Sequence, residues 1–372
     1  MRHASSTWLS SGLLALALLG AATAAKALCL PPLFEGGRRL HQIDGASLFD
    51  LDILLGQHEL CWRSARRPDE RRILLLGNSA VFGAPLPADQ TFWALSNREL
   101  EAAGTGAHIY NLGFASTYQL KEALIVHQAL RYEPHLIVYG VTLADFGHVA
   151  PMPWPPALWS FFAYNTEVVA ALASSGAPGL EEPLATYRAF HPRGRRAWAL
   201  FEKLRQAGAY LRLAARQNAH GLVRAWSVGG EPRASDAEPL LRRGGYRCSE
   251  TLELFERDFH AWQEWNILAY LERVQQQTGT EVLVVNWPVA HAPIGACYNR
   301  RYPSEAQEEY DRWLRSQAES RGLSYLDLHD LVPAEEFPDT LHPSPDGHAR
   351  IASALVRALR ERFPPEPRAR VD

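Results

Sequence analysis

Five short, nearly uninterrupted apolar runs constrain the fold more than any other feature of the sequence. They lie at residues 72–76, 108–112, 135–141, 281–286 and 323–327. Hydrophobicity that is continuous rather than alternating is typical of strands buried on both faces, as in a parallel sheet. Segments with helical periodicity separate most of these runs. The pattern therefore predicts an α/β fold in which helices flank a parallel sheet of about five strands.

Four helices are predicted in the α/β domain from periodicity, with capping residues for two of them. They lie at residues 117–130, 251–276, 304–321 and 345–363. The last has Ser344 in the capping position and Pro345 at the first helical position, and Pro364 ends it. Its apolar residues recur every four positions, so one stripe of this helix is expected to face the core.

A mostly helical insertion is predicted at residues 147–250, because the sequence between the third and fourth runs has no further strand of this kind. It separates the two parts of the α/β domain, residues 31–146 and 251–363, and a tail follows at 364–372. Residues 195–220 place apolar side chains on one face and arginines around the other. Such a helix is typical of a solvated surface, or of contact with anionic lipid or glycan.

The N-terminal residues 1–30 are predicted to be a signal peptide or a membrane anchor. Arg2 precedes a run of apolar and small residues at 8–25, whose length falls between a signal-peptide core and a full membrane span. An uncleaved anchor, a signal cleaved near residues 22–24 and a lipoprotein modified at Cys29 remain open. Each implies export, so we expect a bacterial envelope location, periplasmic or anchored to the inner membrane by residues 8–25.

Composition excludes several classes of protein. Hydrophobic residues make up 47% and charged residues 21% of the chain, which is unlike a disordered protein. The net charge of -3 gives no general attraction to nucleic acid. Four cysteines in an oxidising compartment permit two disulfides, and we favour a pair between Cys248 and Cys297; free buried thiols are the alternative. No Cys-x-x-Cys spacing occurs, and His342, Asp346 and His348 lack clustered further ligands, so neither a metal nor a cofactor is expected.

A serine follows the first predicted strand, in the stretch Gly-Asn-Ser-Ala-Val-Phe-Gly at residues 77–83. This position is the carboxyl edge of the sheet, where open α/β folds bind their ligands. Gly77 permits a tight turn, and a helix that begins near Ser79 points free amides toward developing negative charge. Taken alone, such a stretch is more often a plain turn and helix cap.

An aspartate and a histidine stand close together in the loop before the last predicted helix. Asp339 precedes His342 by three residues, so both side chains can lie on one side of a turn. The carboxylate then accepts a hydrogen bond from one ring nitrogen and leaves the other to take a proton from a serine. Pro343 keeps His342 out of helical geometry. Together with Ser79, this pair predicts a serine hydrolase.

With these two stretches the sequence resembles the SGNH/GDSL hydrolase family. Gly77-Asn78-Ser79 resembles its Gly-Asp-Ser block, residues 111–116 resemble its second block and residues 339–343 its fifth. The resemblance covers residues 70–146 and 280–363. It implies a three-layer α/β/α sandwich in which Ser79 is the nucleophile, His342 the base and Asp339 the residue that orients the base.

Two positions depart from the family pattern. The second block of the family usually ends in a glycine whose backbone amide serves the oxyanion hole. Ser116 occupies that position here and still has a backbone amide. The expected oxyanion donors are therefore the amide of Ser79 and that of Ser116 or Gly113. The third block usually supplies an asparagine side chain, and Ala144 stands in its place. Loss of one oxyanion donor lowers turnover by about 10²–10³. The candidate replacement donors are Asn78, Thr142 and Asn286.

The expected activity is the cleavage or transfer of an acyl ester, on an envelope polysaccharide or lipid, by a Ser-His-Asp mechanism. The alternative is a catalytically weak or inactive SGNH-like protein that binds glycan in an envelope polysaccharide-modification system, because Ala144 removes a donor. A nucleotide-binding protein is disfavoured, since neither Gly-x-Gly-x-x-Gly nor Gly-Lys-Ser/Thr is present.

Overall fold

A computed structural model gives the fold of the chain. It describes residues 51, 55, 58–83, 86–113, 119–146, 165–166, 168–174, 185, 188–189, 192–201, 204–205, 267–290, 304–337 and 341–365. Two compact units are present: one comprises residues 1–66, 154–170 and 182–229, and the other residues 67–153, 171–181 and 230–372. Among the described residues, no helix combines the length and apolar character that crossing a bilayer requires; the run at 8–25 lies outside them.

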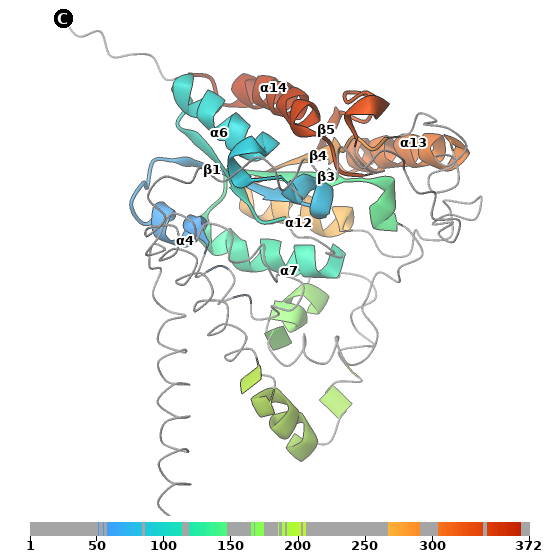
Figure 1. The fold of residues 1–372 in the computed structure, drawn as a ribbon. Coiled ribbons are helices and arrows are strands. Elements are labelled where there is room, and N and C mark those ends of the chain that lie inside the picture. The colour runs from blue at the N-terminus through green and yellow to red at the C-terminus, as the bar shows by residue number, and fades with distance from the viewer. Residues whose placement is uncertain are drawn as a thin grey trace, which may run out of the picture. The chain divides into compact units, whose positions relative to one another are not determined.

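Five parallel strands form one sheet in the second unit (Figure 1). They are β1 (Arg71–Leu76), β2 (Ala107–Asn111), β3 (Leu136–Val141), β4 (Glu281–Asn286) and β5 (Ser324–Asp327). Their order is β2-β1-β3-β4-β5, and each neighbouring pair is parallel. The chain reverses its direction across the sheet between β1 and β3. In open α/β sheets this reversal, at the carboxyl ends of the strands, is where ligands bind.

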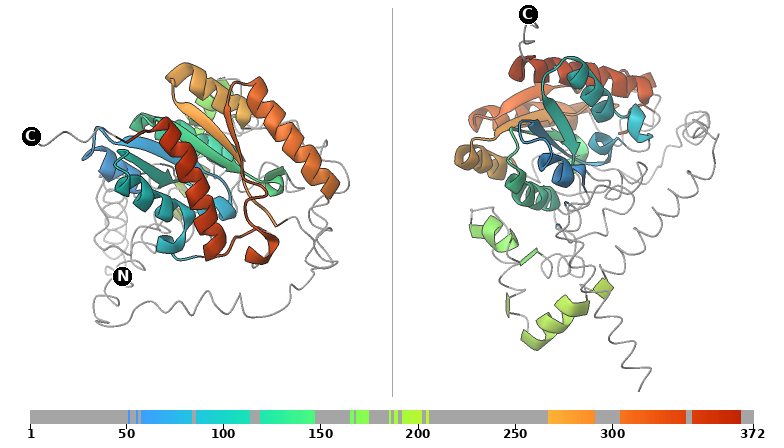
Figure 2. Two further views of the ribbon diagram at one scale, coloured as in Figure 1. Left: turned by 90° about the horizontal axis from the view of Figure 1, so that it is seen from above. Right: turned by 90° about the vertical axis from the view of Figure 1, so that its left-hand side faces the viewer.

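Helices cover both faces of the sheet (Figures 1 and 2). On one face α6 (Phe92–Ala102) packs against α14 (Pro345–Arg362), and both lie over the sheet when it is seen from above in Figure 2. On the other face lie α7 (Gln119–Ala129) and α12 (Leu268–Thr278). The helix α13 (Ser304–Ser320) contacts β4 and β5. Short helical turns complete this unit: α5 (Ser79–Phe82), η2 (Ala88–Gln90), η3 (Leu130–Tyr132), η4 (Leu143–Phe146) and η8 (Ala334–Glu336).

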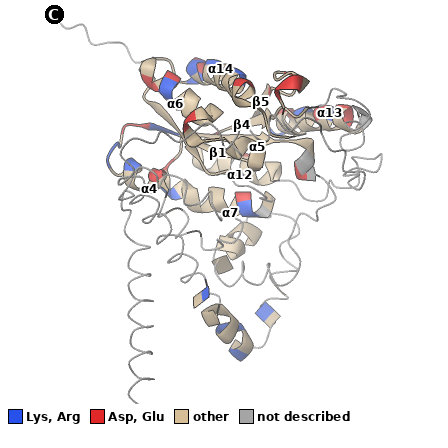
Figure 3. Ribbon diagram, viewed as in Figure 1, with Lys and Arg blue, Asp and Glu red and all other residues tan. Residues whose placement is uncertain are grey.

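The core lies between the sheet and its helices. In β3 every residue is buried, and in β1 and β4 only the first is not. Charged residues occur in the strands only at their ends, and in Figure 3 most of the sheet is tan. The predicted apolar stripe of α14 is buried through Ile351, Leu355 and Leu359. As predicted, Ser344 caps this helix by accepting the Gly347 N–H at 3.3 Å, with proline at the first position.

The predicted α/β fold is confirmed, and each of the five strands lies within one residue of its predicted ends. The helices α7, α13 and α14 lie within two residues of theirs. The helix α6 was not predicted. Its buried face, Phe92, Ser96 and Leu100, includes a serine, and this polar residue interrupts the apolar periodicity by which helices are recognised.

The described residues within 147–250 are all helical, and the predicted limits of the insertion remain predictions. Three of its large apolar side chains, Leu200, Phe201 and Leu204, are 54%, 55% and 48% exposed. Upstream, in the first unit, lies α4 (Glu59–Ser64). It contains Cys61, which is disulfide-bonded. The predicted pair Cys248 and Cys297 lies outside the described residues.

Candidate active site

The turn after β1 presents Ser79 at the carboxyl edge of the sheet. Gly77 has a φ of 146°, and a Cβ there would collide with the carbonyl oxygen of Gly140 in the neighbouring β3, so only glycine fits this turn. Asn78 caps α5, because its Oδ1 accepts the Ala80 N–H at 2.9 Å. Ser79 is therefore the first residue of a single helical turn, at the reversal between β1 and β3.

The hydroxyl of Ser79 meets the imidazole of His342. The distance between Ser79 Oγ and His342 Nε2 is 2.9 Å, and both residues are partly buried. His342 lies between η8 and α14. The loop is held by a hydrogen bond of 2.7 Å from the Ser344 N–H to the Glu336 carbonyl and by the capping of α14. The structure thus brings together two residues predicted from opposite ends of the chain. Asp339 lies outside the described residues.

The predicted backbone donors differ in what they contact. The Gly113 N–H donates to Asn111 Oδ1 at 2.9 Å, so this amide already has an acceptor. Gly113 instead permits close packing, because a Cβ there would lie 3.1 Å from the carbonyl oxygen of Gly77. Ser116 lies outside the described residues. The amide of Ser79 is at the amino end of α5, where helical amides lack intrahelical acceptors.

The three candidate replacement donors direct their polar atoms to other groups. Asn78 Nδ2 donates to Thr142 Oγ1 at 3.0 Å and to the Asp145 carboxylate at 2.9 Å. Thr142 is fully buried and donates to the same carboxylate through its hydroxyl and its backbone amide. Asn286 is fully buried beneath Asp311 and Asp327, to which its amide donates at 2.8 Å and 3.1 Å. We therefore leave these three side chains out of the oxyanion hole.

Comparison with known proteins finds one family model that matches part of the chain. Residues 232–350 match the model of the GDSL-like lipase/acylhydrolase family. The matched residues make up less than half of the chain, so the similarity to this family is shown for that part of the sequence. The matched residues include β4, β5 and His342, whereas β1 and Ser79 precede them, so the link between Ser79 and the matched part rests on the hydrogen bond to His342. Similarity to an acylhydrolase family supports an ester-hydrolysing activity.

Several solved structures resemble the chain at low identity. A lipase/acylhydrolase from Enterococcus faecalis has 13% identity and a TM-score of 0.39, over 80% of this chain and 99% of that one. A carbohydrate acetylesterase from Sinorhizobium meliloti, Est24, has 13% identity and a TM-score of 0.38, over 79% of this chain and 100% of that one. An acetyl xylan esterase has 10% identity and a TM-score of 0.38, over 77% of this chain and 99% of that one. At these values nothing about activity is inferred from them. A search of curated proteins found no match.

Two carboxyl groups that the sequence did not reveal lie in the unit that holds the sheet: Glu122 is buried, and Asp145, which contacts Asn78, is partly buried. Burial and the neighbouring Asp145 raise the pKa of Glu122 to about 8, against the hydrogen bond of 3.0 Å that Tyr139 donates to it. Burial raises the pKa of Asp145 to about 6, although Thr142 and Asn78 donate to it. At neutral pH Glu122 is therefore mostly protonated, and Asp145 carries the negative charge of the pair.

A second histidine of the matched part, His348, has a structural role. Its Nδ1 accepts the Phe92 N–H at 3.1 Å, and its ring stacks on that of Phe92 with 5.6 Å between centroids. Burial, together with the nearby His342, lowers the pKa of His348 to about 4. The ring is thus neutral and holds its proton on Nε2. The described residues contain no cluster of side chains suited to a metal ion.

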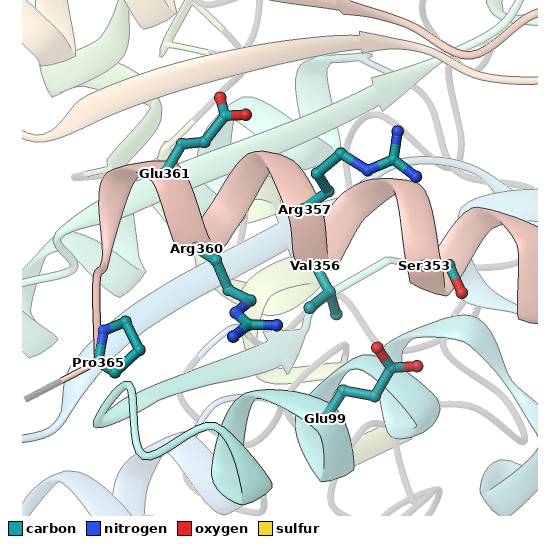
Figure 4. Close-up of a pocket in the computed structure, with 7 residues that line it drawn as sticks. All are labelled: Glu99, Ser353, Val356, Arg357, Arg360, Glu361 and Pro365. Atoms are coloured by element: carbon teal, nitrogen blue, oxygen red, sulfur yellow. The ribbon is translucent and has the colours of Figure 1, made fainter.

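An open groove between α6 and α14 lies apart from Ser79 and His342, neither of which lines it (Figure 4). Its volume is about 450 Å³, and Glu99, Arg357 and Arg360 are among the residues that line it. Figure 4 shows charged side chains of both signs around Val356. Because this groove contains neither candidate catalytic residue, we do not assign it to the acyl substrate.

Proposed function

We propose that the protein is a serine ester hydrolase or O-acyltransferase in which Ser79 is the nucleophile, His342 the general base and Asp339 the orienting carboxylate. The contact of 2.9 Å between Ser79 Oγ and His342 Nε2 carries this proposal. A nucleophile and its base have to lie within hydrogen-bonding distance, and an open α/β sheet places its site at the carboxyl ends of the strands. The match to an acylhydrolase family agrees with ester chemistry.

The reaction proceeds in two halves. Ser79 Oγ attacks the ester carbonyl carbon while His342 Nε2 takes its proton, and the resulting imidazolium then gives a proton to the departing alcohol. Water attacks the acyl-Ser79 ester in the second half, again through His342, and releases a carboxylic acid. When a sugar hydroxyl attacks in place of water, the acyl group is transferred. Asp339 accepts from the other ring nitrogen and keeps the imidazole in the tautomer that the first step needs.

Backbone amides stabilise the tetrahedral intermediate in this proposal. The amide of Ser79 is one donor, and the amide of Ser116, in the loop after β2, is the other. Gly113 is not included, because its N–H donates to Asn111. With Ala144 in the third block no asparagine side chain adds a donor there, so we expect modest turnover, lower by about 10²–10³ than with a third donor.

The proposed substrate is an acyl ester on an envelope polysaccharide or lipid, and the proposed location is outside the cytoplasmic membrane of a bacterium. The apolar run at residues 8–25 supports export. The insertion adds exposed apolar side chains, Leu200, Phe201 and Leu204, beside Arg193 and Arg196. Apolar side chains beside arginines on one helix suit contact with an anionic membrane surface.

Labelling and turnover of the full-length protein test the proposal. A fluorophosphonate probe is expected to label Ser79 alone, as peptide mass spectrometry would show, and p-nitrophenyl acetate is expected to be hydrolysed. S79A removes both signals, and H342Q lowers turnover by roughly 10⁴-fold or more, because the nucleophile and base act as a unit. S353A is the matched control, since Ser353 is exposed on α14 and lines the groove of Figure 4.

Failure of these assays would favour the alternative. If the folded wild-type protein is not labelled and hydrolyses no aryl ester, while it retains an O-acetylated polysaccharide on an affinity matrix, the glycan-binding accessory function replaces the enzyme. Release of acetate from O-acetylated polysaccharide, compared with release of fatty acid from a lipid ester, separates the two substrate classes.

A further inference from the structure

The side chain of Asn78 connects the turn after β1 with the turn after β3. Its Oδ1 accepts the Ala80 N–H at 2.9 Å and so caps α5. Its Nδ2 donates across the sheet edge to Thr142 Oγ1 at 3.0 Å and to the two oxygens of Asp145 at 2.9 Å and 3.1 Å. Because Asn78 immediately precedes Ser79, whatever fixes the Asn78 amide also fixes the start of the helical turn that holds the nucleophile.

Asp145 is the acceptor at the centre of this connection. Its Oδ2 accepts the Thr142 N–H at 2.7 Å and the Thr142 hydroxyl at 3.0 Å, and the Asp145 N–H donates to the Thr142 carbonyl at 3.0 Å. The turn is thus closed on itself, and its carboxylate is left facing Asn78. Only 7% of Asn78 and none of Thr142 is exposed. Asp145 itself is partly buried, and a hydrogen bond to an ionised carboxylate is stronger than one between neutral groups.

We propose that Asp145 is a positioning residue, which holds Ser79 within reach of His342 by fixing Asn78. It touches no reacting atom. The inference rests on the proposed function, because it concerns the placement of the proposed nucleophile. Without the carboxylate the Asn78 amide loses its charged acceptor, and the first turn of α5 is held to β3 less firmly. A displacement of about 1 Å at a reacting group lowers turnover by roughly 100-fold.

Three titratable groups face Asp145 from the surrounding elements, and each is uncharged at neutral pH. Glu122 of α7 is mostly protonated, since burial raises its pKa to about 8. Burial likewise raises the pKa of Tyr139 of β3 and of Tyr310 of α13, so both phenols keep their protons. Among Asp145 and these three groups, only Asp145 is negatively charged. The neutral Asn78 amide can donate a hydrogen bond to it without adding charge. A second carboxylate at position 78 would repel it.

Exchange of the amide and the carboxylate tests the proposal. In N78D, the introduced carboxylate keeps an acceptor for the Ala80 N–H but lies about 3 Å from that of Asp145, the separation that Asn78 and Asp145 now have. When both carboxylates are ionised they repel each other, and protonation of one of them removes the repulsion. Relative to the wild type at the same pH, we expect kcat for p-nitrophenyl acetate to fall by roughly 10- to 100-fold where both are ionised, with KM little changed, and this deficit to shrink as the pH is lowered. D145N loses a similar factor at all pH values. N78D/D145N restores a complementary pair and regains most of the lost kcat.

Two further variants separate positioning from general destabilisation. N97D is the matched control: Asn97 pairs with the backbone of Ile109 at 2.7 Å and 2.9 Å, so N97D lowers the melting temperature without moving the pH profile. T142V removes only the hydroxyl contacts and serves if N78D does not fold; a several-fold loss of kcat is expected.

The outcomes separate failure of this inference from failure of the proposed function. If wild-type Ser79 is labelled and turns over ester, but N78D or T142V keeps the wild-type kcat and pH profile, or the double variant is no better than the worse single variant, Asp145 does not position Ser79. If wild-type Ser79 is not labelled at all, the proposed function fails first, and this inference fails with it.

Discussion

Replacement of Gly140 by alanine is expected to displace Ser79, the proposed nucleophile, without touching it. Gly140 lies in β3, where a Cβ would come within 2.6 Å of Val81 Cγ2 and 3.0 Å of Trp287 Cε3. Carbon atoms in good contact are about 3.5–4.0 Å apart, so Val81 has to retreat by roughly 1 Å. Val81 is fully buried and stands two residues after Ser79 in the single turn of α5. Ser79, in the same turn, is therefore expected to move with it, which disturbs its 2.9 Å contact with His342.

The substitution is expected to lower both kcat and the free energy of unfolding. A displacement of about 1 Å is expected to lower kcat by roughly 100-fold, and an extra methyl group in a packed core costs about 1–3 kcal/mol of unfolding free energy. The assay is hydrolysis of p-nitrophenyl acetate together with the rate of fluorophosphonate labelling of Ser79. Thermal unfolding followed by circular dichroism measures the stability. KM is expected to change little, because the substrate surface is not altered.

A second substitution shows whether the Val81 contact is the cause. V81A removes the methyl groups that the new side chain meets, so V81A/G140A is expected to regain much of the activity that G140A loses. G279A is the control, because nothing lies within 4 Å of a Cβ there while its φ of +74° makes alanine strained. It should lower stability by about 1 kcal/mol and leave kcat unchanged. The reasoning is refuted if G140A keeps wild-type turnover, or if V81A/G140A is no more active than G140A.

Three other changes give independent tests. Because burial raises the pKa of Glu122 from 4.5 to about 8, the folded protein keeps a proton that the unfolded chain loses, so the unfolding free energy falls as pH rises through this interval. E122Q should match the wild type near pH 4.5 and be more stable at pH 8.5, by at most roughly 5 kcal/mol; an equal melting temperature at pH 8.5 would contradict this. D339N should lower kcat by roughly 10⁴-fold with little change in unfolding, because the imidazole tautomer is no longer fixed; a near-normal kcat would remove Asp339 from the mechanism. S344A should cost α14 about 1 kcal/mol in thermal unfolding, since Ser344 caps it, and an unchanged melting temperature would show that the cap contributes nothing.

The sheet could be predicted because its strands are buried on both faces. Runs such as Leu74 to Leu76 in β1 have no polar alternation, and this continuity is visible in the sequence alone. Ser79 and His342 could be predicted for a related reason: each stands at a strand end or helix start that the same patterns located. The helix α6 was not predicted, because periodicity records only apolar residues and Ser96 lies on its buried face.

The surroundings of the site could not be predicted, because they depend on which turns meet across the sheet. Asn78 looked like a spare donor, but its partners Thr142 and Asp145 are 64 and 67 residues away in the sequence. Gly113 looked like an oxyanion donor until its amide was seen to bond to Asn111, two residues away. Glu122 gave no signal at all: a glutamate in a helix is normally exposed, and only the packing of α7 shows that this one is 3% exposed.

The contact between Ser79 and His342 joins residues 263 positions apart, and this separation has a consequence for synthesis. A ribosome has to translate the chain as far as residue 342 before the proposed base exists, and the loop that carries it is anchored at the start of α14, which packs on α6. Nascent and truncated chains that end before residue 342 therefore carry a serine without a proton acceptor. Ester hydrolysis should therefore appear late, when α14 packs on the rest of the unit. It would then indicate that the chain has folded, and not only that it has been synthesised.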